Sequence, residues 1–258
     1  MAMVLTERRG AVALLTLNNP AQYNALGGTL ISELNAAFDA VLADKTVRAI
    51  VLTGAGKGFC AGAALGGPTF DAGERVAALL RDEVSPLIEK MRAAEVPIVV
   101  AVNGPAAGAG VGIALAGDIV LAARSAKFVL SFVRLGAALD AGTSQLLQRS
   151  VGVARARALA LLGEPLDAAR AEQWGLIWKA VDDAQLMAEA FALAQKFAEG
   201  PPISLGLIKA QVEAAWAAPL AAALEGEAVA QGKVFVTADL REGAAAFVEK
   251  RAARFSGR

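Results

Sequence analysis

Hydrophobic side chains in the first half of the chain follow two spacings in turn. Residues 2–17 alternate as expected of a two-stranded hairpin, which Asn18-Asn19-Pro20 ends. Further along, short apolar runs of strand length are separated by segments whose apolar positions recur at helical spacing. The runs cover residues 48–53, 97–102 and 119–122, and the helical segments cover 30–42 and 76–91. This alternation predicts an α/β fold with crossover connections and a parallel sheet buried by helices.

Beyond about residue 143 the pattern is mostly helical. Asp239 and Glu242 are spaced like a capping box before the last helix, with aspartate in the role of serine or threonine. The total of 258 residues fits one large domain, or a core with an appended helical part. The predicted late helices cover residues 168–174, 184–198, 203–216 and 240–251.

A glycine-rich segment, residues 103–118, follows the apolar run 97–102 and begins a predicted buried helix. Gly108, Gly110 and Gly112 lie in its first turns. Each glycine costs a helix interior roughly 1 kcal/mol relative to alanine, so three of them need a reason. Either a group approaches the backbone closely, usually a negative one at a helix N-terminus, or the helix packs tightly against a neighbour. The spacing does not match the dinucleotide fingerprint or the phosphate loop.

Composition excludes several classes of protein. With 56% hydrophobic and 19% charged residues, the chain is expected to build a sizeable core. The 25 basic and 25 acidic residues cancel, which argues against nucleic acid or an anionic membrane as a partner. The uncharged run 96–117 is interrupted by Asn103, Pro105 and glycines, so no membrane span is expected.

Two residue counts limit the chemistry. The single cysteine, Cys60, fits a reducing cytosol, and we expect a cytoplasmic protein with Cys60 as a buried, inert thiol. No histidine is present, which removes Ser-His-Asp and Cys-His catalysis and most zinc sites, and no metal is expected. Acid–base work is left to carboxylates, lysine, Tyr23 or bound water.

Three segments in order, residues 58–65, 103–118 and 126–152, resemble the enoyl-CoA hydratase/isomerase (crotonase) family. Weaker similarities in residues 18–26, 171–177 and 241–251 extend the resemblance over essentially the whole chain. Each motif alone is weak evidence, but all of them in order are strong evidence.

The resemblance implies a crotonase-like spiral of β-β-α turns over residues 1–200 and a helical trimerisation region over residues 201–258. It also implies a homotrimer or hexamer, acyl-CoA thioester substrates, and no cofactor beyond the coenzyme A of the substrate. The backbone N–H groups of Ala63 and Ala109 would form an oxyanion hole for the thioester oxygen, which is a role suited to a helix N-terminus. The implied substrate-binding residues are Asn24, Ala25, Ala61, Leu65, Phe132, Leu139, Phe247 and Lys250.

The chain departs from the hydratase pattern at both catalytic glutamates, whose positions fall at Gly112 and Phe132. One acid remains: Asp140 resembles the aspartate of the phenylacetyl-CoA pathway isomerases and of the 4-chlorobenzoyl-CoA dehalogenases. The segment 122–128 favours the isomerase branch, in which an asparagine usually stands at the Gly112 position. The dehalogenases also carry a tryptophan at the Phe132 position and a histidine that this chain lacks.

We therefore expect an acyl-CoA isomerase in which Asp140 moves a proton between carbons, with a pKa raised by Leu139 and Phe132. Three alternatives stay open: Asp140 as a turn residue, a hydratase or hydrolase that uses this one carboxylate, and a non-catalytic acyl-CoA binder. Asp118 is interpreted as a structural cap. Lys57 and Arg134 could meet the coenzyme A phosphates or be solvated surface charges.

Overall fold

The computed structural model describes residues 2–64 and 73–258, and its strands form two sheets. In the larger sheet the order is β1-β2-β3-β4-β6-β9; β1 pairs antiparallel with β2, and the other neighbours are parallel. Its strands are β1 (Val4–Arg9), β2 (Val12–Leu17), β3 (Ala49–Gly54), β4 (Ile98–Val102), β6 (Ile119–Ala123) and β9 (Lys179–Val181). The smaller sheet contains β5 (Ala106–Ala107), β7 (Lys127–Val129) and β8 (Pro165–Asp167). The predicted hairpin and parallel sheet are confirmed.

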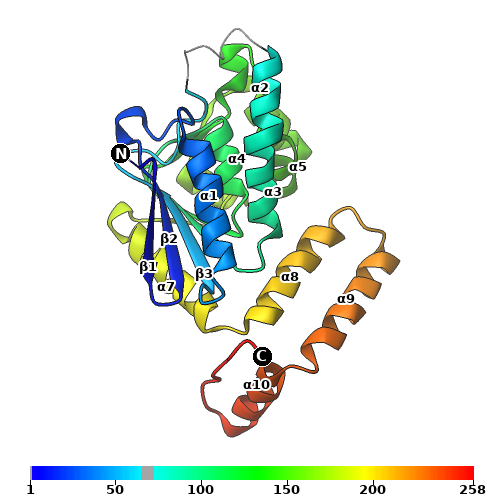
Figure 1. Ribbon diagram of the computed structural model, residues 1–258. Helices are drawn as coiled ribbons and strands as arrows, with labels where there is room; N and C mark the ends of the chain where they lie inside the picture. The colour runs from blue at the N-terminus through cyan, green and yellow to red at the C-terminus, as the bar shows by residue number, and fades with distance from the viewer. Residues whose placement is uncertain (1, 65–72) are drawn as a thin grey trace.

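Helices cover the large sheet on both faces, with α1 on one side and α7 on the other (Figure 1). Every residue of β3 and β4 is buried, which explains why these strands read as continuous apolar runs rather than alternating ones. The helices are α1 (Leu30–Ala43), α2 (Gly73–Leu79), α3 (Ser85–Ala93), α4 (Ala109–Leu115), α5 (Thr143–Leu162), α6 (Ala168–Gln173), α7 (Leu186–Glu199), α8 (Pro202–Ala215), α9 (Leu220–Val234) and α10 (Ala238–Glu249). A π-helical turn, Leu80–Val84, joins α2 to α3.

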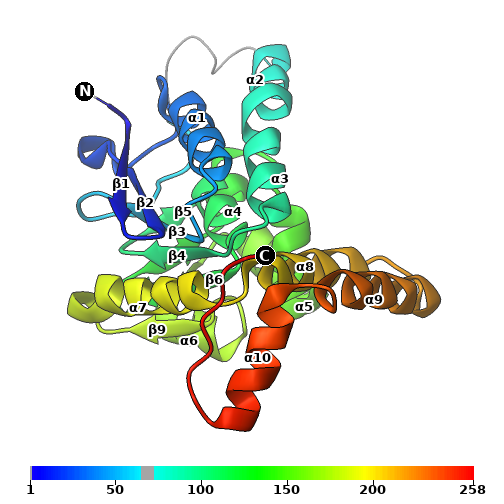
Figure 2. The same ribbon diagram turned by 60° about the horizontal axis from the view of Figure 1, so that its bottom comes forward.

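The last three helices extend away from the sheet (Figures 1 and 2). Ion pairs attach α8 to the core: Lys209 lies 2.8 Å from Asp118, and Glu213 accepts hydrogen bonds from Arg92 and Arg149. Asp118 also accepts a bond from the Ile98 N–H at 2.7 Å. Asp118 is therefore structural, but it links β4 to α8 and does not cap a helix.

One sequence prediction in this region is wrong. The cap of α10 is Thr237, whose hydroxyl accepts a hydrogen bond from the Leu240 N–H at 3.1 Å. Asp239 lies inside the first turn, where its carboxylate accepts bonds from the N–H groups of Ser256 and Gly257 at 2.7 and 2.9 Å. The capping role belongs to the threonine because a cap must precede the first helical residue.

No helix within the described ranges, residues 2–64 and 73–258, is long and apolar enough to cross a membrane. The uncharged run 96–117 instead divides into β4, β5 and α4. The interruption at Asn103 and Pro105 that the sequence indicated is the connection between the first two of these elements.

Candidate active site

The N-terminus of α4 is buried in the centre of the fold. Its cap, Gly108, has φ +53°, a conformation that favours glycine, and its N–H donates to the Val129 carbonyl at 2.9 Å. Ala109 follows as the first helical residue and is only 4% exposed. Its N–H donates no hydrogen bond to any group that the structure describes. This leaves a free donor at the positive end of a helix dipole.

The turn that contains Ala63 presents a second N–H group without a hydrogen-bond partner in the described residues. The Leu26 N–H donates to the Gly62 carbonyl at 2.7 Å, and the Ala64 N–H donates to the Leu26 carbonyl at 3.4 Å. In this parallel bridge the N–H of Ala63 points away from Leu26. A Cβ built on Gly62 would lie 3.3 Å from the Ala109 nitrogen, so the two turns are in contact.

Asp140 is a half-buried carboxylate in the connection just before α5. Its Oδ1 atom is buried and has no hydrogen-bond partner in the described part of the chain. Burial raises the pKa of Asp140 to about 6, in the direction that the apolar flanking residues predicted. The backbone is firmly held, because the Asp140 carbonyl accepts bonds from the Thr143 N–H at 2.9 Å and from the Thr143 hydroxyl at 2.7 Å.

Glycine contacts show that these segments meet at α4. A Cβ built on Gly112 would overlap the Ala141 carbonyl oxygen, directly after Asp140. One turn earlier, a Cβ on Gly108 would lie 3.7 Å from the Phe132 ring. Residues three apart share a helix face, so the segment of Asp140 lies along the same side of α4 as Ala109. The tight-packing explanation of the glycines is confirmed for Gly112.

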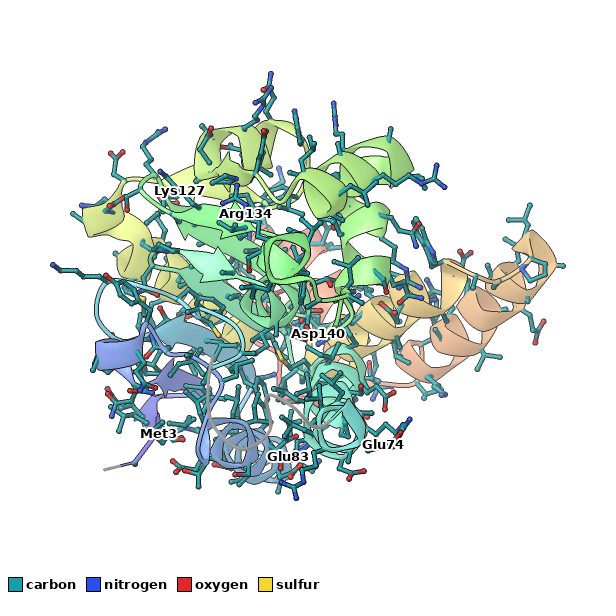
Figure 3. The ribbon with its side chains drawn as sticks, turned by 90° about the horizontal axis from the view of Figure 1, so that it is seen from above. Met3, Glu74, Glu83, Lys127, Arg134 and Asp140 are labelled. Carbon is teal, nitrogen blue, oxygen red and sulfur yellow. The ribbon has the colours of Figure 1, made fainter. Side chains whose placement is uncertain are left out.

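Figure 3 places Asp140 near the centre of the view, with Lys127 and Arg134 on one side and Glu74 and Glu83 on the other. Asp140 takes part in no ion pair among the described residues. Burial alone therefore accounts for the raised pKa. A carboxylate with such a pKa, in a segment that packs against the helix beginning at Ala109, can take up and return a proton.

Comparison with known proteins decides the family. A model of the family described as enoyl-CoA hydratase/isomerase matches residues 7–258. The chain belongs to the enoyl-CoA hydratase/isomerase family. A 1,2-epoxyphenylacetyl-CoA isomerase from Escherichia coli K12 is 42% identical over 265 residues, covering 100% of both chains. A probable enoyl-CoA hydratase from Rhodobacter capsulatus is also 42% identical, over 96% of this chain and 95% of that protein.

A solved structure supports the same assignment. The enoyl-CoA hydratase from Bacillus anthracis matches with a TM-score of 0.95 at 31% identity, covering 100% of both chains. The crotonase-like fold that the sequence predicted is therefore confirmed. Relatives with isomerase names and with hydratase names match equally well, so the family alone does not decide the reaction.

Asn24 is fully buried and organises the loop before Ala63. Its amide donates to the carbonyls of Ala55, Gly58 and Phe59 at 3.0, 2.9 and 3.1 Å, and its Oδ1 accepts from the Asn19 N–H at 2.8 Å. These bonds hold the loop of residues 55–59 against the Asn24 side chain. Ala25 is buried next to it, and Ala61 is exposed in the loop, with its N–H bonded to the Tyr23 carbonyl at 2.9 Å.

The remaining family positions are spread over the molecule. Leu139 is partly buried against the core, and Phe132 is buried beside Gly108. Phe247, 85% exposed, and Lys250 lie at the end of α10, far from α4 within one chain (Figures 1 and 2). Leu65 lies outside the described residues.

Three more side chains were assigned roles from sequence. Cys60 is buried, as the sequence predicted, and burial raises its pKa to about 12, which disfavours the reactive thiolate. Lys57 and Arg134 are exposed, which leaves both of their interpretations open. Sequence reasoning missed Thr143, although a threonine at the first position of a helix is a recognisable sign of a local backbone hydrogen bond.

Proposed function

We propose that the protein is an acyl-CoA isomerase, which shifts a double bond or rearranges a ring-derived acyl group through a thioester enolate. The observation that carries this proposal is the half-buried carboxylate of Asp140: its Oδ1 has no hydrogen-bond partner among the described residues, and its neighbour Ala141 packs against Gly112 of α4. The free N–H groups of Ala63 and Ala109 support it, because an enolate oxygen needs such donors. The substrate supplies coenzyme A, and the proposed reaction requires no other cofactor.

The proposed reaction moves one proton. The Asp140 carboxylate removes a proton from a carbon of the acyl chain, and the electron pair left behind delocalises onto the thioester oxygen. The amides of Ala63 and Ala109 donate hydrogen bonds to that oxygen, each worth roughly 3–4 kcal/mol in the transition state. The protonated Asp140 then returns the proton to a different carbon, and the double bond has moved. A pKa of about 6 leaves the base ionised at neutral pH and strengthens it relative to an ordinary aspartate.

Hydration by two glutamates is disfavoured by the residues at those family positions. Gly112 has no side chain, and the hydrocarbon ring of Phe132 cannot activate water. Asp140 is the carboxylate that the described residues place beside Gly112, through the contact of Ala141. A hydratase that uses Asp140 alone is the second candidate, favoured by the hydratase names among the relatives.

The products formed from a panel of thioesters distinguish the candidates. Purified protein is incubated with 3-enoyl-, 2-enoyl- and ring-derived acyl-CoA, and the products are separated by liquid chromatography and mass spectrometry. We expect a product of unchanged mass with a moved double bond or rearranged ring. Formation of 3-hydroxyacyl-CoA, which is heavier by one water, would favour the hydratase. Tight binding without turnover would indicate a non-catalytic binder.

We also propose that the chain assembles as a trimer or a dimer of trimers. The arm formed by α8 and α9 exposes Val212, Trp216, Leu220 and Leu224, each at least half exposed. Large apolar side chains left this exposed on two packed helices usually indicate a protein interface. Light scattering should give three or six times the chain mass of 26.3 kDa. A monomer at micromolar concentration would contradict the assembly.

A further inference from the structure

Backbone touches backbone where α4 passes the segment that carries Asp140. A Cβ built on Gly112 would overlap the carbonyl oxygen of Ala141 and lie 2.8 Å from its Cβ and 3.0 Å from its carbonyl carbon. Non-bonded carbon atoms prefer separations of about 3.5–4.0 Å, so any side chain at position 112 must push the two elements apart. Gly112 is thus required by close packing rather than by its own backbone conformation.

The helix cannot retreat from such a side chain. All residues of α4 are buried, and a Cβ on Gly110 would overlap the Cys60 carbonyl oxygen. The segment of Asp140 has more room to move, because residues 133–138 immediately before it are exposed. A side chain at position 112 is therefore expected to displace Asp140 and Ala141, and to leave α4 in place.

Backbone packing also decides how deeply the Asp140 carboxylate lies. Its buried Oδ1 atom has no hydrogen-bond partner, and the carboxylate takes part in no ion pair in the parts of the chain described, so no polar contact of that atom fixes its place. Two contacts hold the segment instead. The fully buried Thr143 donates two hydrogen bonds to the Asp140 carbonyl, and α4 packs against the segment. Ala141 itself has φ +48°, a conformation unfavourable for alanine that only tight surroundings maintain.

We infer that Gly112 is a positioning residue for Asp140: its missing side chain lets the backbone at Ala141 pack against α4, one turn from Ala109, and so sets the depth of the neighbouring Asp140 carboxylate. The expected effect of Gly112 on turnover rests on the proposed function. The expected effect of Gly112 on the position of the carboxylate rests on packing alone. Gly112 thereby governs proton transfer more than the affinity for acyl-CoA.

The variant Gly112→Ala tests this placement. The added methyl should move the carboxylate toward solvent, so its pKa should fall from about 6 toward the ordinary aspartate value. A displacement of about 1 Å is enough to lower kcat by roughly 10- to 100-fold. The dissociation constant for a non-reacting acyl-CoA should change less than about twofold, since the Ala63 and Ala109 amides are kept. Adding Ala141→Gly should recover part of both losses, because it removes the Ala141 Cβ that lies 2.8 Å from the added methyl, and because glycine, which adopts positive φ freely, lets the carbonyl shift.

Gly117→Ala is the matched control. This buried glycine lies just after α4, and its Cβ would overlap a methyl of Val100 rather than the segment of Asp140. It should cost similar stability and leave the pKa of Asp140 and kcat unchanged. The pKa is read by carbon-13 NMR of aspartate-labelled protein, with Asp140→Asn to assign the signal. This readout does not depend on turnover, so it stands even if the protein proves not to be an isomerase.

Two results would overturn the inference. One is a folded Gly112→Ala protein that keeps the pKa near 6 and the wild-type kcat. The other is failure of both Gly112→Ala and the Gly112→Ala/Ala141→Gly double variant to fold while Gly117→Ala folds, which would reduce Gly112 to a packing role. If Asp140→Asn alone leaves turnover intact, the proposed function fails, and the NMR titration still decides whether Gly112 places the carboxylate.

Discussion

Replacing Asp140 with asparagine should lower kcat by about two to four orders of magnitude, in line with the loss of a general base. Asparagine keeps the shape of the side chain and can still donate or accept a hydrogen bond, but it cannot take up a proton. No substitute is expected at the two family glutamate positions, because Gly112 and Phe132 occupy them. Acyl-CoA affinity should stay nearly unchanged. The measurement is exchange of the acyl proton for deuterium in heavy water, followed by NMR together with steady-state kcat.

A matched control separates chemistry from general loss of charge. Asp82, exposed in the π-helical turn, should tolerate replacement by asparagine with wild-type exchange and turnover. If the Asp140→Asn protein exchanges the proton at the wild-type rate, Asp140 is only a turn residue and the isomerase mechanism is wrong.

The raised pKa of Asp140 gives this variant a second signature. In the wild-type protein kcat/KM should rise as the pH passes about 6, because the base must be ionised, and Asp140→Asn should lack this limb. Stability should respond in the opposite direction. Because the folded-state pKa lies above the unfolded value, the folded protein binds the proton more strongly, and stability falls as the pH rises from about 4 to 6. Asparagine cannot ionise, so the variant should melt no lower than wild type at pH 7.5.

The spacing of apolar residues was enough to predict the strands and helices in which buried positions are continuous or recur at a fixed period. Strands β3 and β4 are buried on both faces and read as unbroken apolar runs, and α1 buries one stripe of apolar residues. Apolar spacing did not predict α9. Ala230 is the one residue of this helix that is buried, and its alanine-rich sequence shows no apolar stripe. The short strands β5, β8 and β9 contain two or three residues each, too few for a period to be visible.

Some residues of the candidate site could be proposed from sequence, and others could not. Asp140 and the amides of Ala63 and Ala109 could be proposed from motifs in the chain, because each lies within a short recognisable segment. The contact between Gly112 and Ala141 joins two segments that no spacing rule connects. The buried amide of Asn24 likewise reads as a substrate-binding motif in sequence, whereas its hydrogen bonds hold a distant loop. Residues that act by holding backbone in place become visible only in three dimensions.

The second large effect is expected from Ala109→Pro, which should reduce kcat by about a hundredfold or more, as the loss of one oxyanion donor does elsewhere. The substitution suits the fold. Ala109 is the first residue of α4, where proline is tolerated, and its N–H makes no bond within the described chain that proline would break. Gly108 before it, at φ +53° and ψ −125°, has the mirror-image extended conformation that glycine can keep in front of proline.

Two further variants isolate the N–H group from the ring. Ala109→Gly keeps the donor and should retain kcat within a few-fold, since the helix loses only one methyl. Ala168→Pro places proline at the first residue of α6, equally buried but outside the segments that meet at α4, and should leave kcat unchanged if the protein folds. Thermal unfolding verifies the fold of each variant before its kinetics are compared. A folded Ala109→Pro protein with near-normal kcat would remove this amide from the site, because proline cannot donate the hydrogen bond on which the proposed enolate depends.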